Sequence, residues 1–293
     1  MRRLFVWTSA MVCPILALAV VAGCGGTPSQ EENKQETKEG SKKASVLEGD
    51  YTGAITGKVT LKGDKPDFDR LNKELQAKMK EKDEAHCLAA DAKPEEKEQQ
   101  SWRIDDKGGV ANVFVWIAPP KGKFFHVDPA KKTWEDEVDI DQPHCAFTPH
   151  VVVTFPYYKD DAGKKVETKQ KFFVKNSSPD INHNTNVAGG FNETIPAKGA
   201  PKLVEGLEPS SKPVFIKCDI HTWMNAYAGV FDHPYATTTK KDGTFEIKNV
   251  PVGVEVLIYA WHEKAEYLND GGAKGQSIKL DAKTAKDFTI EAK

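Results

Sequence analysis

The chain has 293 residues, of which 39% are hydrophobic and 29% are charged, and its net charge at neutral pH is −2. That balance gives no basic field of the kind that phosphate backbones attract, so nucleic acid is not an expected partner. The length allows one large or two small folded domains.

The first 23 residues are typical of an export signal. Two arginines precede an apolar run that ends at Val21, and the small pair Ala22-Gly23 stands directly before Cys24. The run is interrupted by polar residues and a proline, and it is short for a bilayer span, which needs about 20 apolar residues. We therefore predict a signal peptide over residues 1–23 and lipidation of Cys24. The lipid would anchor the mature protein to a membrane of the cell envelope, facing the periplasm or the cell exterior.

Residues 24–50 are expected to form a disordered tether behind the lipidated cysteine. They contain no aromatic residue and are rich in Glu, Lys, Ser and Gly. Such a composition does not bury enough apolar surface to fold.

Beyond the tether the pattern predicts an all-β protein with one short helix near residues 67–85. Asp67 is the expected N-cap of that helix, whose apolar residues form one stripe. Elsewhere short apolar runs alternate with turn residues, which favours sandwiches over a parallel α/β sheet. The predicted strands are 54–61, 110–117, 137–140, 150–155, 171–175, 214–217, 226–231, 244–248, 254–261 and 286–290.

A domain boundary is expected near His233-Pro234-Tyr235. Residues 233–293 contain turns at 241–243 and 250–253 between strands, and this pattern resembles the carboxypeptidase regulatory-like β-sandwich, a module without catalytic residues. The usual opening strand of that family is found upstream, at Gly57-Lys58-Val59. Residues 51–99 thus hold a leading strand and the helix, which either stand apart or belong to the C-terminal sandwich.

The segment most informative about chemistry is Cys218-x2-His221-x2-Met224, directly after the strand 214–217. A thiolate and imidazoles with a weak axial thioether form the ligand field of blue-copper sites. Such a site needs a second histidine, and His183 stands 35 residues upstream of Cys218, followed by Asn184.

These motifs resemble those of the cupredoxins of the amicyanin and plastocyanin type, over residues 100–232. The resemblance implies a Greek-key sandwich that binds one copper ion, as Cu(I) or Cu(II). Its equatorial ligands would be His183, Cys218 and His221, and its axial ligand Met224. Asn184 would hold the loop and hydrogen-bond toward the sulfur of Cys218, and we expect Trp223 to pack over the site and exclude water.

Three cysteines remain after Cys13 leaves with the signal and Cys24 is acylated. An odd number in an exported protein indicates one unpaired or liganding thiol, for which Cys218 is the natural candidate. Cys87 and Cys145 are then expected to form a disulfide. Each follows a histidine, His86 and His144, so a second metal site, with His150 as a further ligand, is the alternative.

The function expected from these residues is one-electron transfer to a redox protein that docks transiently at the ligand-loop face. An enzyme is not expected, because four protein ligands close the coordination sphere, and no hydrolase elbow, metalloprotease motif or phosphate loop occurs. Copper storage or delivery, and a metal-free envelope module that binds protein or glycan, are the alternatives. The oligomeric state is unknown from the sequence.

Overall fold

The computed structural model of the chain describes residues 44–292. The predicted signal peptide, Cys24 and most of the predicted tether lie outside the described residues. No helix in the described part is long and apolar enough to cross a membrane.

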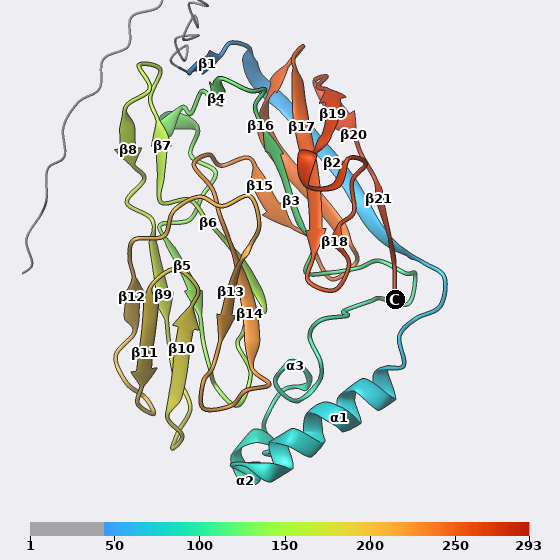
Figure 1. The fold of residues 1–293 in the computed structure, drawn as a ribbon, viewed down its shortest axis with the longest axis vertical. Helices are drawn as coiled ribbons and strands as arrows, with labels where there is room; N and C mark the ends of the chain where they lie inside the picture. The colour runs from blue at the N-terminus through green and yellow to red at the C-terminus, as the bar shows by residue number, and fades with distance from the viewer. Residues whose placement is uncertain (1–43, 293) are drawn as a thin grey trace, which may run out of the picture. The chain divides into compact units, whose positions relative to one another are not determined.

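The fold is all-β with short helices, as predicted, and its sheets form two sandwiches (Figure 1). In the first sandwich a five-stranded sheet of order β11-β10-β13-β14-β6 faces a three-stranded sheet of order β12-β9-β5. Apolar side chains from both sheets share one buried core, which also contains Cys218 and Met224. The strands are β5 (Glu137–Ile140), β6 (Val151–Thr154), β9 (Lys171–Val174), β10 (His183–Val187), β11 (Phe191–Ile195), β12 (Lys202–Val204), β13 (Val214–Lys217) and β14 (Asn225–Val230).

The second sandwich pairs a sheet of order β15-β3-β17-β18, with β19 beside β17, against a sheet of order β16-β2-β20, with β21 also beside β2. Alternate residues of these strands point into its core, as the two-residue period of a half-buried strand requires. The strands are β2 (Asp50–Lys62), β3 (Phe114–Ala118), β15 (Ala236–Thr238), β16 (Thr244–Val252), β17 (Glu255–His262), β18 (Glu266–Tyr267), β19 (Gln276–Lys279), β20 (Lys283–Ala285) and β21 (Phe288–Glu291).

The leading strand β2 lies inside the second sandwich, between β16 and the parallel strands β20 and β21. One strand of the predicted 100–232 domain lies there too, and here the predicted boundary is wrong. β3 pairs with β15 and β17, although it precedes every strand of the first sandwich. Its residues are buried on both faces, which suits a central strand between a core and a neighbouring sandwich.

An aromatic cluster joins the two sandwiches. Phe114 and Trp116 of β3 and Trp261 of β17 form it with Phe231. Tyr227 of β14 contacts the Trp261 ring, with a centroid separation of 5.2 Å. The sheet with β3 and β17 therefore buries its second face against the sheet with β14.

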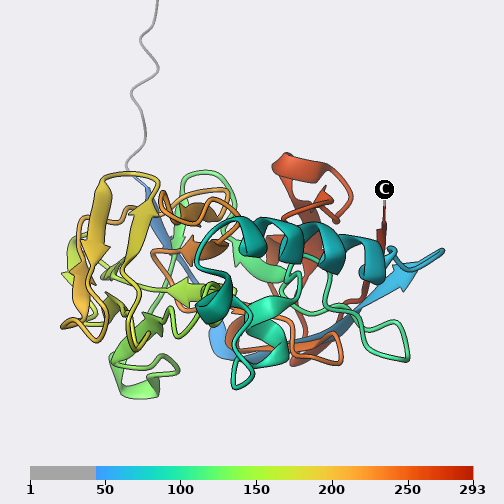
Figure 2. The ribbon, with the colours of Figure 1, turned by 90° about the horizontal axis from the view of Figure 1, so that it is seen from below.

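The helical segment follows β2 and runs below the second sandwich toward the end of the first (Figures 1 and 2). Phe68 and Leu71 accordingly pack on the core of the second sandwich, and Leu75 and Met79 on the core of the first. Helix α1 (Phe68–Glu81) begins as predicted, because the Asp67 side chain accepts a hydrogen bond from the Arg70 backbone N–H. Two single-turn helices follow, α2 (Glu84–Cys87) and α3 (Pro94–Lys97), and short 3-10 turns occur at Pro129–Lys131 and Gly272–Lys274.

The predicted tether extends too far toward the C-terminus. Residues Ser45–Leu47 form β1, which pairs with β4 (Lys123–Phe125), and Leu47 is buried in the core of the second sandwich. The local apolar pair Val46-Leu47 outweighs the polar composition of the residues before it. A second small ribbon joins β7 (Tyr157–Lys159) and β8 (Lys165–Glu167).

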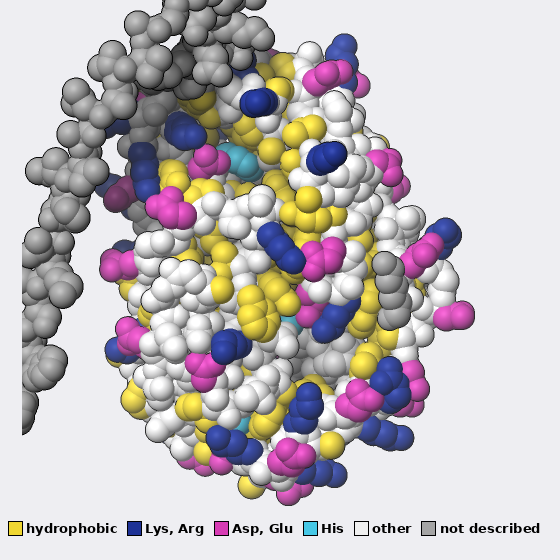
Figure 3. Space-filling model, viewed as in Figure 1, with side chains coloured by type: hydrophobic (Ala, Val, Ile, Leu, Met, Phe, Trp, Pro, Cys, Tyr) yellow, Lys and Arg dark blue, Asp and Glu magenta, His cyan; other side chains and the backbone are white. Residues whose placement is uncertain are grey.

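Acidic and basic side chains are interspersed on the face shown in Figure 3, and neither sign forms a continuous field there. This distribution agrees with the small net charge of the chain.

Burial of His262 makes stability depend on pH. Its side chain is fully buried against Trp102, and burial lowers its pKa to about 4. In the unfolded chain this histidine takes up a proton near pH 6.5, whereas in the folded chain it stays neutral down to about pH 4. The free energy of unfolding is therefore highest above pH 6.5 and falls as the pH drops toward 4. We expect protonation of His262 to lower the free energy of unfolding by about 3 kcal/mol. Urea unfolding at pH 7.5 and pH 4.5 should show a smaller pH effect for His262→Gln, and an identical effect in both proteins would contradict the assignment.

Candidate metal centre

Three predicted ligands meet at the helical end of the first sandwich. Ligand atoms of His183, Cys218 and His221 all lie within 4.8 Å of one another, and all three side chains are buried. Cys218 is the first residue after β13, His221 lies in the loop that follows, and His183 opens β10. Strands β10 and β13 are neighbours in one sheet, which brings residues 35 positions apart to the same end.

The ligand loop is a tight turn that returns the chain from β13 into β14. The Cys218 N–H donates to the Met224 carbonyl at 3.2 Å, and the Met224 N–H donates to the His221 carbonyl at 2.9 Å. Met224 is buried in the same apolar core as Cys218. The turn therefore fixes all three loop residues by backbone bonds and burial.

Two backbone N–H groups point at the Cys218 sulfur. Asn184 donates from 3.4 Å and His221 from 3.3 Å, and the His221 Nδ1 atom lies 4.0 Å from the same sulfur. N–H donors favour the negative sulfur of a thiolate, and hydrogen bonds around a ligating sulfur tune the potential of a bound metal.

Asn184 makes both contacts that were predicted for it, one to the Cys218 sulfur and one to the ligand loop. Its backbone, and not its side chain, reaches the sulfur of Cys218. The side-chain oxygen accepts from the Asp219 N–H at 3.1 Å, and the amide nitrogen donates to Asn192 and to the Glu193 carbonyl. The side chain thus joins the ligand loop to β11 across β10.

His183 is the most unusual group of the site. Its side chain is 0% exposed, and neither ring nitrogen has a hydrogen-bond partner. Burial, with smaller contributions from His221 and His86, lowers the pKa of His183 to about 3. The imidazole is therefore neutral, and its lone pair is free for a cation.

His221 is oriented by a carboxylate that the sequence analysis missed. Its Nε2 atom lies 2.8 Å from Asp83 Oδ2, so Nδ1 faces the sulfur. Burial lowers the pKa of His221, and Asp83 opposes that shift. A histidine whose far nitrogen donates to a carboxylate is the usual arrangement around protein-bound metals.

The segment around α2 and the Trp223 side chain form a cover over the buried His221 ring, while Asp219 and Thr222 of the ligand loop stay exposed. Lys82 Nζ donates to the Ile220 carbonyl at 3.1 Å, next to the contact between Asp83 and His221. Trp223 packs against the His221 ring at 5.2 Å, and its Nε1 donates to the Cys145 carbonyl. The segment around α2 therefore covers part of the ligand-loop face, on the side of His221.

The predicted disulfide between Cys87 and Cys145 is confirmed. It excludes the alternative site that needed both thiols, and His150, the further ligand considered there, pairs with Glu263 in a buried contact. Cys218 is the free cysteine of the described residues. The disulfide sulfurs lie within 4.8 Å of a ring nitrogen of His221, so the bridge fastens α2 beside the ligand loop.

The donor set fits copper. A thiolate and two imidazoles suit Cu(I) and Cu(II) alike, and the orphaned nitrogens of His183 lack the partners that buried polar atoms ordinarily have. No protein-family model matches this chain, and a search of curated proteins gives no match.

Loss of the disulfide should weaken the fold and the cover together. The bridge closes a sequence separation of 58 residues, for which the chain-entropy estimate is about 4 kcal/mol. We expect the double variant Cys87→Ala/Cys145→Ala to lose stability of that order in urea unfolding. Amide exchange in residues 82–89 should accelerate more than exchange in β13, and uniform acceleration would argue against a local clamp.

Proposed function

We propose that this chain binds one copper ion and carries single electrons at the cell envelope, tethered by a lipid on Cys24. His183, Cys218 and His221 would hold the ion, with the Met224 thioether as a fourth, weaker ligand. The first sandwich is then cupredoxin-like, and the second, regulatory-like sandwich serves as a spacer or docking surface. Bound copper would supply the one-electron couple, and the protein would hold its ligands.

The observation that supports this most strongly is the environment of His183. A buried imidazole with two unpartnered nitrogens costs free energy, on the order of 1–3 kcal/mol, unless something binds it. Ligand atoms of Cys218 and His221 lie within 4.8 Å of the His183 ring, and both are metal ligands, of the soft and the intermediate class. A cation among the three groups removes that cost.

Rigid support suits electron transfer. The ligands stand on adjacent strands of one sheet, and backbone bonds fix the loop between Cys218 and Met224. Such a frame changes little between Cu(I) and Cu(II), so little reorganisation accompanies the electron. The closed set leaves no open position of the kind that copper catalysis uses.

The redox partner is proposed to dock on the segment around α2 that covers His221, and not directly on the ligand loop. The route from copper to the surface is short there, because His221 contacts Asp83 and one third of the Asp83 side chain is exposed. A small transient interface is enough for such an encounter.

Titration with Cu(II) tests the site directly. The apo chain should develop an intense thiolate-to-copper absorption band that saturates at one equivalent, and Cys218→Ala should lack it while keeping its circular dichroism spectrum. Ala replaces a buried thiol that makes no disulfide, so the fold should survive. A wild-type protein that stays colourless and retains no copper would exclude the carrier and favour the metal-free binding module.

Asp83 should set the reduction potential through His221. Asp83→Asn keeps an acceptor and tolerates the left-handed backbone at this position, where φ is +56°. Without the carboxylate charge His221 is a weaker donor to Cu(II), so we expect a higher potential and roughly 10- to 100-fold weaker Cu(II) binding. Glu84→Gln removes the same charge one residue away, where the side chain is exposed, and should leave both quantities near the wild-type values.

A further inference from the structure

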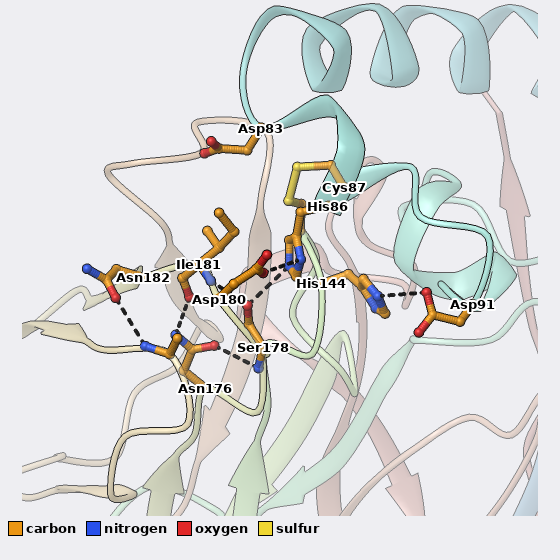
Figure 4. A network of polar contacts seen from close by, with 12 residues as sticks. Asp83, His86, Cys87, Asp91, His144, Asn176, Ser178, Asp180, Ile181 and Asn182 are labelled. Atoms are coloured by element: carbon orange, nitrogen blue, oxygen red, sulfur yellow. Dashed lines mark hydrogen bonds and ion pairs between the residues drawn. A yellow bond between two sulfur atoms is a disulfide. The ribbon is translucent and has the colours of Figure 1, made fainter.

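A solvent-open pocket of about 400 Å³ lies beside the candidate metal centre, between α2 and the loop 179–181 (Figure 4). Four carboxylates and two imidazoles supply its polar lining, and no lining residue is Lys or Arg. These six residues, called the acidic pocket below, are Asp83, Glu84, His86, Asp91, His144 and Asp180.

The acidic pocket is graded from exposed carboxylates to buried imidazoles. The side chains of Asp91 and Asp180 are 87% and 69% exposed, whereas those of His144 and His86 are 12% and 6% exposed. Asp180 lies 3.1 Å from His86 Nδ1, and Asp91 lies 3.7 Å from His144 Nε2. A cation drawn in by the outer charges therefore meets nitrogen ligands next.

His86 connects the pocket to the buried site. One of its ring nitrogens lies within 4.8 Å of a ring nitrogen of His183, and its ring stacks on His144 at 5.0 Å. A metal bound by two imidazoles has each nitrogen about 2.0 Å away. A shift of less than 1 Å in the two rings would thus let one ion contact both His86 and His183.

The surroundings of His86 suit transient binding of a metal ion. Its side chain is 6% exposed, and its Nδ1 atom faces the exposed carboxylate of Asp180, a partner that can turn to solvent. Its Nε2 atom lies 3.2 Å from the Ser178 hydroxyl, which can turn to donate or to accept. His86 can therefore exchange its present partners for an ion without leaving a charge buried.

Other approaches to the centre are closed or offer no unpaired imidazole to an entering ion. His221 is 0% exposed behind Asp83 and Lys82. The pocket on the Met224 side, of about 250 Å³, is lined by Lys78 together with carboxylates and amides. Its histidine, His150, is already paired with Glu263.

We propose that the acidic pocket is the entrance through which a copper ion reaches the buried ligands, and that His86 passes the ion to His183. This inference rests on the proposed copper function. It assigns uptake to residues that are outside the final ligand set.

Rapid mixing of the full chain with Cu(II) tests the route, with the thiolate-to-copper band as the readout of loading. Asp91→Asn/Asp180→Asn removes two exposed charges at the mouth, and we expect loading to slow by about tenfold at low salt with the final absorbance unchanged. The wild-type rate should fall as salt is added, and the rate of the variant should fall less. The matched control is Asp64→Asn/Asp106→Asn, two exposed carboxylates outside the pocket, which should load at the wild-type rate.

His86→Gln tests the hand-over itself. It should load more slowly than the wild type even at high salt, where steering by the carboxylates is screened, and should reach the same copper stoichiometry. Equal loading rates in the wild type, the pocket variants and the control would overturn the entrance while leaving the copper site intact. A wild-type protein without the band would instead overturn the proposed function, and this inference with it.

Discussion

The bridge between Cys87 and Cys145 is the constraint on which the candidate metal centre depends. It joins α2 to the segment before β6, and that segment also accepts the Trp223 hydrogen bond at the Cys145 carbonyl. Helix α2 has a single turn and would not persist alone in water. Held by the bridge, it presents Asp83 to His221 and covers this buried ring.

Burial of the candidate ligands has two opposing effects on the free energy of the protein. It removes water from His183 and Cys218, which destabilises the metal-free fold because two ring nitrogens lose their solvent partners. It also strengthens every electrostatic contact at the site, since the local dielectric is low. The apolar core of the first sandwich, which packs both sheets around Cys218 and Met224, holds this unfavourable arrangement in place. A ligand that binds only the folded chain then adds to stability with the logarithm of its concentration relative to its dissociation constant.

The sequence predicted the strongly patterned elements well. The predicted strands 137–140 and 214–217 match β5 and β13 residue for residue, because both combine branched apolar residues with flanking turns. Strand β11 was missed because Phe191–Ile195 contains Asn, Glu and Thr, and its stability comes from pairing with β10. β3 was predicted as a strand, but its pairing with β17, about 140 residues later, leaves no local trace.

The centre itself was predictable only in part. Cys218, His221 and Met224 form a short motif, and His183 was found because a site of this type needs a second imidazole. Asp83 carried no such pattern, because it is an ordinary residue in a charged helical segment. His86 was considered only as a ligand of a second site, because it precedes Cys87. Asp83 stands 138 positions before the His221 ring that it orients. Only the topology shows that the segment after β2 returns over the end of β10 and β13.

Asp83 belongs both to the candidate metal centre and to the acidic pocket, so a change at one of these sites affects the other. Its carboxylate accepts from His221, which affects the electronic properties of the centre, and it also lines the acidic pocket. An ion in the pocket would draw the carboxylate away from His221 and loosen the cover while loading proceeds. With the pocket empty, the Asp83 carboxylate is in hydrogen-bond contact with His221 and holds the ring in place. If the proposed route is right, one carboxylate would serve both the entry of the ion and its retention, because the groups that line the pocket and the groups that orient the ligands share this residue.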